Sequence, residues 1–222
     1  MRFLNLICDS NENSLFESVS DRFNAFQSYK IVKCICGFIF LNPRPDFSEI
    51  KNHYSKNSNY IPHNSLKFNL FNVVYRFVQK FTFYIKKRKI KKTTNQKYIN
   101  LLDIGSGDGR FLQYLEKSLN INIYVDEPFI DLNFASINDN LSIECDIITM
   151  WHSLEHIHDI DNIFNVINKY LKNDGYLLIA VPNINAHELK YFKSNWIAYD
   201  APRHLYHFSY NSIKRLLKKY NF

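Results

Sequence analysis

Residues 101–111 have the sequence LLDIGSGDGRF, which is the most informative stretch of this chain. An apolar run is followed by glycine at three alternate positions and then by a helical pattern, which indicates a strand that turns tightly into a helix. A dinucleotide-binding fingerprint would need glycine where Arg110 stands, and a P-loop would need a Gly-Lys-Ser/Thr sequence that is absent. Since neither phosphate-binding motif fits, the pattern indicates a nucleoside ligand whose charged tail is not a phosphate.

The sequence around this turn alternates between strand-like and helical patterns. Such alternation predicts an α/β fold in which a mostly parallel sheet is flanked by helices. We expect strands at 98–104, 121–125, 147–150 and 176–181, a turn at 173–175, and helices over 111–119, 160–171 and 212–220. The segment 1–47 instead predicts a small β-rich unit, with strands at 29–33 and 38–41.

Four segments of the chain together resemble the class I S-adenosylmethionine-dependent methyltransferases. They are LDIGSGDGRFL at 102–112, ITMWHSLEHIHD at 148–159, NDGYLLIAVPN at 173–183 and WIAYDAPRHLYHFS at 196–209. More narrowly, the chain resembles the subgroup that carries a small cysteine-rich, zinc-ribbon-like unit and an H-x-L-E-H segment. The resemblance implies a Rossmann-like methyltransferase fold, S-adenosyl-L-methionine as cofactor, and methyl transfer to a small molecule, foremost a sugar nucleotide or surface-glycan precursor.

The resemblance also implies which residues hold the cofactor. Residues of the glycine-rich turn line its amino-acid end, and an acidic residue at the end of the second strand holds the ribose, since a carboxylate can accept from both hydroxyl groups. Asp126 and Glu127 both stand at that position, and the choice between them stays open. The implied cofactor-binding residues are Asp103, Gly105, Ser106, Gly107, Asp126, Glu127 and Trp151.

Polar residues follow the strand at 147–150, at the carboxyl edge where ligands of such sheets bind. His152, Glu155 and His156 are the catalytic candidates there, because an imidazole is suited to general-base chemistry near neutral pH. Two alternatives stay open: Glu155 and His156 could cap the next helix, or His152 and His156 could bind zinc, although no third ligand is indicated. The candidates for substrate recognition, with aromatic packing of their segment as the alternative, are Arg203, His204 and His207.

Three cysteines of the N-terminal unit, Cys8, Cys34 and Cys36, are the metal-ligand candidates by resemblance to the zinc knob of the subgroup. The usual knob has two C-x-x-C pairs. Here Asn11 stands where the partner of Cys8 would fall, and Cys34 and Cys36 are one residue too close. Three thiolates do not complete the four ligands of a tetrahedral zinc ion.

Two further departures concern the methyltransferase domain, predicted at 98–222. Only 18 residues separate Glu127 from Asp146, which predicts a shortened helix or strand where the family covers adenine. The chain stops at Phe222 before the expected C-terminal hairpin, so the strand at 176–181 should form an uncovered edge. This leaves open a truncated product, a non-catalytic remnant of the fold, or a second copy that covers the edge. The candidate adenine contacts are Phe129, Phe134, Asn138 and Asp139.

The positive charge of the chain is local. The formal net charge is +7, yet residues 86–92 carry six cations, and without them the 28 basic residues fall to 22 against 21 acidic ones. This concentration disfavours a nucleic-acid partner, which needs a charged face or groove. Residues 48–97 are predicted as a linker with a helix at 66–85, which could lie on an anionic membrane through residues 66–92 or pack on the catalytic domain.

Cysteine usage and hydropathy bear on location. Four cysteines, unevenly placed, do not make a secreted disulfide framework, so a reducing compartment is expected. The N-terminus shows no signal-peptide pattern, and nowhere do 18 uncharged apolar residues follow one another. We therefore expect a cytoplasmic protein, at the inner membrane surface if the basic helix binds lipid.

Overall fold

A computed structural model describes residues 6–8, 10–24, 26–51, 53, 70–128, 132, 134–137 and 142–222. The chain divides into two compact units, neither of which is continuous in sequence. The sheet unit comprises His63–Ser153 and Asn165–Ala180. The mixed unit comprises Met1–Pro62, Leu154–Phe164 and Val181–Phe222, so contacts group the C-terminal segment with the N-terminal residues.

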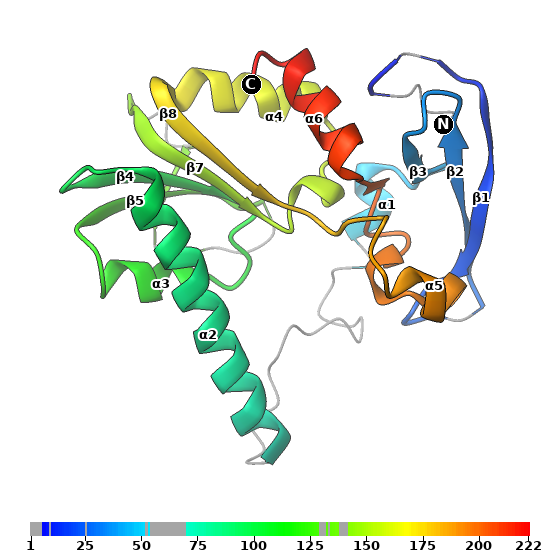
Figure 1. The fold of residues 1–222 in the computed structure, drawn as a ribbon, viewed down its shortest axis with the longest axis horizontal. Helices are drawn as coiled ribbons and strands as arrows, with labels where there is room; N and C mark the ends of the chain where they lie inside the picture. Colours follow the sequence, from blue (N-terminus) through cyan, green and yellow to red (C-terminus); the bar gives the residue numbers. More distant parts are fainter. Residues whose placement is uncertain are drawn as a thin grey trace. The chain divides into compact units, whose positions relative to one another are not determined.

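The sheet unit is built on a five-stranded sheet in which every neighbouring pair of strands is parallel (Figure 1). Its order is β6-β5-β4-β7-β8, which confirms the predicted α/β, Rossmann-like fold class. The strands are β4 (Ile99–Ile104), β5 (Ile121–Asp126), β6 (Ala135–Ser136), β7 (Cys145–Trp151) and β8 (Leu171–Ala180).

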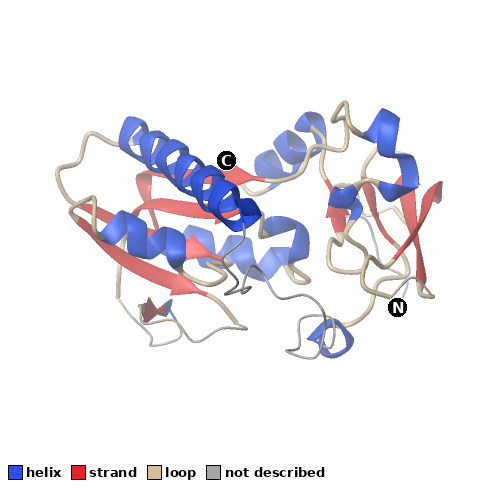
Figure 2. Cartoon of the chain, turned by 90° about the horizontal axis from the view of Figure 1, so that it is seen from below, coloured by secondary structure: helices blue, strands red, loops and turns tan. Residues whose placement is uncertain are grey.

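Helices α2 (Leu70–Thr93) and α3 (Arg110–Glu116) share one apolar cluster with the central strands. Figure 2 shows the blue helices running along the red strands. A parallel strand is shielded on both faces, which explains why β4 and β7 are apolar almost throughout. The buried members of the cluster are Ile90, Ile99, Leu101, Phe111, Leu112, Leu115, Ile123, Val125 and Ile147.

The register of the sheet gathers the strand ends that matter for ligand binding. Asp103 lies beside Val125 of β5 and beside Thr149 of β7. The carboxyl ends of the three strands therefore meet at one edge, where open α/β sheets bind ligands.

The C-terminal part of the sheet differs from expectation. The turn predicted at 173–175 lies inside β8, where the pairing with β7 is irregular between Cys145 and Ile147. Strand β6 has only two residues, in agreement with the predicted shortening, and the described residues between β5 and β6 contain no helix. Strand β8 ends the strand order, so within the described ranges no strand covers its outer side.

The mixed unit holds a four-stranded antiparallel sheet of order β1-β2-β3-β9. The strands are β1 (Asn13–Ser20), β2 (Ser28–Cys34), β3 (Ile39–Leu41) and β9 (Tyr206–His207). Strand β9 comes from the far end of the chain, and its Tyr206 pairs with Phe40. Stacked or tilted rings of Phe38, Phe40, Tyr206 and Phe208 lie 5.7 to 6.0 Å apart and fill the core.

Short helices complete the mixed unit. They are α1 (Phe47–Lys51), α5 (Leu189–Phe192), α6 (Tyr210–Lys219) and the 3-10 turns η2 (Leu154–His156), η3 (Lys193–Asn195) and η4 (Ile197–Tyr199). Helix α6 starts with a capping box between Ser209 and Ser212 and buries Leu216. Helix α4 (Ile160–Tyr170) is divided between the units, since its residues up to Phe164 belong to the mixed unit and those from Asn165 on to the sheet unit. It buries Phe164 and Ile167.

Helix α2 is longer at its C-terminal end than predicted. Residues 66–69 of the predicted helix lie outside the described ranges, and the helix continues through the basic cluster to Thr93. Lysine and arginine are good helix formers, and Ile90 within the cluster is completely buried, which holds this turn on the sheet unit. No helix in the described part of the chain combines the length and hydrophobicity needed to cross a membrane.

Candidate active site

The glycine-rich turn after β4 has the backbone shape that only glycine adopts readily. Gly105 has a φ of +75° and Gly107 a φ of +55°. A Cβ atom at Gly105 would lie 2.4 Å from the Cβ atom of Ser153, whereas one at Gly107 would meet no atom of the described residues within 4 Å. The backbone of Gly107 is therefore open to a ligand, and Gly105 is needed for close packing against the end of β7.

Two acidic residues at the end of β5 meet this turn in different ways. The Gly105 N–H donates to the backbone oxygen of Asp126 at 2.9 Å. The Gly107 N–H donates to the Glu127 carboxylate at 2.8 Å. Burial raises the pKa of Asp126. Of the two candidates for the ribose-binding acid, Glu127 is thus the one whose carboxylate faces the glycine turn.

The buried Asp103 and the half-buried Lys86 carry opposite charges that interact near the turn. The Thr149 hydroxyl donates to the Asp103 carboxylate, and burial raises the pKa of Asp103 to about 6. Burial lowers the pKa of Lys86, while the negative charge of Asp103 opposes that shift. The Lys86 ammonium lies 4.9 Å from the ring centre of Trp151 and 5.1 Å from that of Phe111.

Sequence reasoning missed Lys86, which it counted only as part of the basic cluster. Its side chain is largely shielded, unlike those of Arg88 and Lys89 beside it. The signal was available: Lys86 stands three residues after Phe83 and four before Ile90, and both of those pack on the sheet unit. Lys86 therefore lies on the inward face of α2.

The end of β7 presents polar atoms that have no partner among the described residues. These atoms are the indole nitrogen of Trp151 and the hydroxyl of Ser153, both buried. Between them, His152 holds a left-handed φ of 59° and donates its backbone N–H to the Ala180 oxygen at 2.8 Å. Buried donors lacking partners and a strained backbone are typical of ligand sites. The Ser106 hydroxyl, in contrast, donates to the Asp103 backbone oxygen at 3.0 Å.

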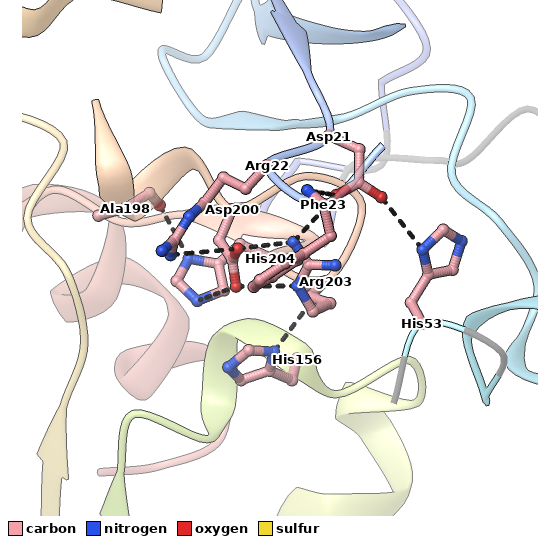
Figure 3. A network of polar contacts seen from close by, with 9 residues as sticks. All are labelled: Asp21, Arg22, Phe23, His53, His156, Ala198, Asp200, Arg203 and His204. Carbon is pink, nitrogen blue, oxygen red and sulfur yellow. Dashed lines mark hydrogen bonds and ion pairs between the residues drawn. The ribbon is translucent and has the colours of Figure 1, made fainter. Parts of the chain in front are cut away.

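A second cluster lies within the mixed unit, where η2 meets the loop after η4 (Figure 3). The imidazole rings of His156 and His204 cross edge to face with centres 4.6 Å apart. The Nδ1 atom of His156 lies 3.0 Å from the Arg203 carbonyl, and that of His204 lies 2.8 Å from the Ala198 carbonyl. A carbonyl only accepts, so the Nδ1 atom of each ring carries a hydrogen. The Nε2 atom of His204 lies 3.9 Å from the Asp200 carboxylate.

The protonation state of His156 and the donor atoms around it determine what this cluster can do chemically. Burial, followed by the nearby His204, lowers the pKa of His156 to about 4, so the ring is neutral at pH 7. Glu155, His156 and His204 can each offer one ligand atom within 4.8 Å of the others. The cluster could therefore accept a proton or, by its donor set, hold a divalent metal.

Arg203 contacts this cluster through its backbone carbonyl. Its guanidinium is only 1% exposed and donates to the carboxylate of Asp200 at 2.8 Å and of Asp21 at 3.3 Å. Asp21 in turn pairs with His53 at 3.2 Å (Figure 3). The predicted substrate contact is thus engaged with two buried carboxylates, and its backbone carbonyl orients His156.

His207, the third candidate for substrate recognition, lies inside β9. Its side chain is buried and meets the ring of Tyr199 edge to face at 5.4 Å. Burial lowers its pKa to about 3, so the ring is neutral at pH 7. This is the aromatic packing that the sequence left open as an alternative.

The three candidate metal ligands of the N-terminal segment come together. Cys8 and Cys34 have sulfur atoms 3.5 Å apart, and with Cys36 all three sulfurs lie within 4.8 Å of one another. They are free thiols, and burial raises the pKa of Cys8 to about 11. In the described ranges no fourth histidine, cysteine or carboxylate joins the group. The set fits three of the four corners of a zinc site.

The predicted site residues therefore fall into two groups, one in each compact unit. The sheet unit holds the implied cofactor residues and His152, whereas Glu155, His156 and the candidates for substrate recognition belong to the mixed unit. Of the candidate adenine contacts, Phe129, Asn138 and Asp139 lie outside the described residues. Phe134 lies against α3, 3.7 Å from where a Cβ atom of Gly109 would stand.

A protein-family model described as a methyltransferase domain matches residues 71–222, which is more than half of the chain. The chain belongs to this family. The match includes the glycine-rich turn, the acidic end of β5 and both histidine segments, so it covers residues of both groups. No curated protein matches the chain.

The chain is similar to several solved structures, one of which, with a TM-score above 0.5, shares its fold. The plantazolicin methyltransferase BpumL, solved in complex with SAH, is 17% identical, with a TM-score of 0.51 over 64% of each chain. A SAM-dependent methyltransferase from Archaeoglobus fulgidus is 20% identical, with a TM-score of 0.44 over 67% of this chain and 74% of its own. A Haemonchus contortus phosphoethanolamine N-methyltransferase 2 is 18% identical, with a TM-score of 0.43 over 63% of this chain. The chain spans 37% of the length of the Haemonchus protein and 64% of BpumL.

Proposed function

We propose that this methyltransferase uses S-adenosyl-L-methionine and transfers its methyl group to a small molecule. The observation that carries the proposal is the glycine turn after β4, where the open backbone of Gly107 lies against the Glu127 carboxylate. A nucleoside with an amino-acid tail fits a turn that has room for backbone contact and an acceptor for hydroxyl groups. The structure of BpumL with SAH supports this class of cofactor.

The charged residues of the sheet unit suit the two ends of this cofactor. Glu127 would accept from the ribose hydroxyls, and the ring of Trp151 would border the bound molecule. Lys86 and Asp103 would pair with the carboxylate and the ammonium of the amino-acid tail. When bound, S-adenosylmethionine supplies an electrophilic methyl group on a sulfonium. The protein then has to position the acceptor and exclude water.

We propose the histidine pair of the mixed unit as the proton acceptor. The Nδ1 atom of His156 donates to a backbone carbonyl and its ring is neutral at pH 7, so its Nε2 atom can take up a proton, and His204 lies against it edge to face. A hydroxyl or amine acceptor loses a proton as it gains the methyl group, and a neutral imidazole can take that proton. In this proposal His152 and Glu155 help to orient the acceptor, and Arg203 is a positioning residue that holds the carbonyl facing His156.

The acceptor class comes from the subgroup resemblance rather than from the geometry. The H-S-L-E-H segment at 152–156 and the cysteine cluster support membership of the subgroup with a cysteine-rich unit. We therefore propose sugar nucleotides or surface-glycan precursors as the first acceptors to test. The alternative is a non-catalytic remnant, motivated by the two-residue β6.

Calorimetric titration of the purified chain with S-adenosylmethionine and with S-adenosylhomocysteine tests the cofactor. We expect binding by the natural sequence, and its loss in Gly105→Arg, whose side chain would collide with Ser153. Gly37→Arg is the matched control, because Gly37 also has a positive φ but lies in the mixed unit with no atom near its Cβ position. A folded natural chain that binds neither compound refutes the enzyme proposal and supports the remnant.

We also propose that Cys8, Cys34 and Cys36 hold a zinc ion with a fourth ligand outside this cluster. Metal analysis of protein purified without chelator should find one zinc per chain. The zinc should be lost in Cys36→Ser and retained in Cys145→Ser, since Cys145 is buried in β7 of the other unit. Natural protein that contains no zinc as purified, and that binds none after incubation with excess zinc, would contradict this proposal.

A further inference from the structure

Helix α2 turns its more apolar side away from the unit on which it packs. The buried Ile90 and the half-buried Phe83 and Lys86 mark its inward face. At about 100° per residue, Phe77, Phe81 and Ile85 lie on the opposite side of the helix. The exposed apolar residues of α2 are Val74 (56%), Phe77 (74%), Val78 (54%), Phe81 (57%), Tyr84 (48%) and Ile85 (40%).

Positively charged residues follow the apolar residues of this stripe toward the C-terminal end of α2. Arg88 and Lys92 follow Phe81 and Ile85 at helical spacing, so they lie in the same stripe, with Lys89 at its border. All three cations are exposed. The apolar residues and the cations together form a strip along one side of the helix, and in Figure 1 the N-terminal half of α2 extends beyond the sheet.

The charge of α2 selects the kind of surface that it suits. The helix has eight lysines and arginines and no aspartate or glutamate among its 24 residues. A protein partner or a second copy of this chain would bring its own mixture of charges, whereas anionic lipid offers a uniformly negative surface above an apolar layer. Helices with aromatic residues on one side and flanking cations lie in the interface of such membranes.

We propose that the outward strip of α2 binds the surface of an anionic lipid membrane. The aromatic residues Phe77 and Phe81 insert between the headgroups, and Arg88, Lys89 and Lys92 contact the lipid phosphates. Such a contact is peripheral and reversible, as for other helices that lie in the membrane interface. It is independent of the proposed cofactor site, since the strip lies on the side of α2 opposite to Lys86.

Co-sedimentation of the full chain with lipid vesicles tests the proposal. We expect binding to vesicles that contain phosphatidylglycerol, little binding to pure phosphatidylcholine, and a decrease with salt. Neutralising two cations in Arg88→Gln/Lys92→Gln should lower the partition coefficient about 30-fold, since each membrane-facing cation contributes about fivefold. Removing the two exposed rings in Phe77→Ser/Phe81→Ser should also reduce binding strongly.

Matched variants elsewhere on the surface separate a specific strip from general charge. Lys214→Gln/Lys218→Gln removes two exposed cations from α6, and Phe26→Ser/Phe192→Ser removes two exposed rings from the mixed unit. Both controls should bind as the natural chain does. Absence of vesicle binding, or equal losses in the controls and the α2 variants, would overturn the proposal. The proposal would also be overturned if the natural chain bound no vesicles and formed a dimer that the Phe77→Ser/Phe81→Ser substitutions abolish. Cofactor titration of the same variants distinguishes these outcomes from failure of the proposed enzyme activity.

Discussion

Replacing Gly105 by alanine should destabilise the sheet unit through a collision whose partner is known. The added Cβ atom would stand 2.4 Å from the Cβ atom of Ser153, and neither atom is the end of a flexible side chain. Gly107→Ala is the matched comparison, because its φ of +55° is also left-handed but its Cβ atom would meet nothing within 4 Å. The two variants thus share the backbone cost and differ in the steric cost.

The expected magnitudes follow from these two contributions. A left-handed backbone costs an alanine about 1–2 kcal/mol, and the loss of flexibility in the unfolded chain returns about 0.4–1 kcal/mol. Gly107→Ala should therefore lower the free energy of unfolding by about 1 kcal/mol. Overpacking adds about 1–3 kcal/mol, so Gly105→Ala should lower it by about 2–4 kcal/mol. Adding Ser153→Gly removes the colliding atom and should restore most of the difference.

Urea unfolding followed by tryptophan fluorescence measures these values. The chain has two tryptophans, Trp151 in the sheet unit and Trp196 in the mixed unit, so a Trp196→Phe background reports the sheet unit alone. The coupling between Gly105→Ala and Ser153→Gly is obtained from a double-mutant cycle. If Gly105→Ala proves no more harmful than Gly107→Ala, or if the coupling is below about 0.5 kcal/mol, the steric argument is wrong.

Three further predictions concern the mixed unit. Arg203→Met leaves the buried carboxylates of Asp21 and Asp200 without their shared cation and should cost about 3–5 kcal/mol in urea unfolding; a loss below about 1 kcal/mol would contradict it. Burial lowers the pKa of His156 from its ordinary 6.5 to about 4, so between these values the unfolded chain binds a proton that the folded chain does not. The free energy of unfolding should therefore fall as the pH falls from 6.5 to 4. His156→Gln should reduce the slope of this pH dependence by about 1.4 kcal/mol per pH unit; an unchanged slope would show that the folded chain does not lower the pKa of His156. Ser209→Ala removes the cap of α6 and should cost about 1 kcal/mol in the same unfolding assay, with Ser14→Ala, an exposed residue outside any helix, as the neutral control.

Local sequence patterns were sufficient for the elements of the sheet unit. The apolar runs at 98–104, 121–125 and 147–150 became β4, β5 and β7, and the glycines at 105 and 107 took the left-handed conformations that a tight turn requires. These features depend on neighbours within a few residues, so a single sequence shows them. The turn predicted at 173–175 falls within β8, where the register with β7 passes from Leu171 opposite Cys145 to Tyr176 opposite Ile147.

Contacts between distant residues could not be predicted in the same way. The pairing of Arg203 with Asp21 joins residues 182 positions apart, and the orientation of His156 depends on the carbonyl of Arg203. The sequence placed Arg203 and His156 among the candidates, but it did not name Asp21 and did not show that the arginine would be buried between carboxylates. Nor did it show that His207 would lie inside a sheet formed by both ends of the chain.

Helix α2 shows most plainly which properties the sequence determined and which depended on tertiary contacts. The spacing of its apolar residues determined that a helix would form, and its composition determined that the helix would be cationic. The same spacing is expected whether the stripe faces a core or a membrane, because helical periodicity records only that residues share a side. Which side packs on the sheet unit was decided by the fit of Phe83, Lys86 and Ile90 against α3 and the strands, and that fit turned the apolar stripe outward.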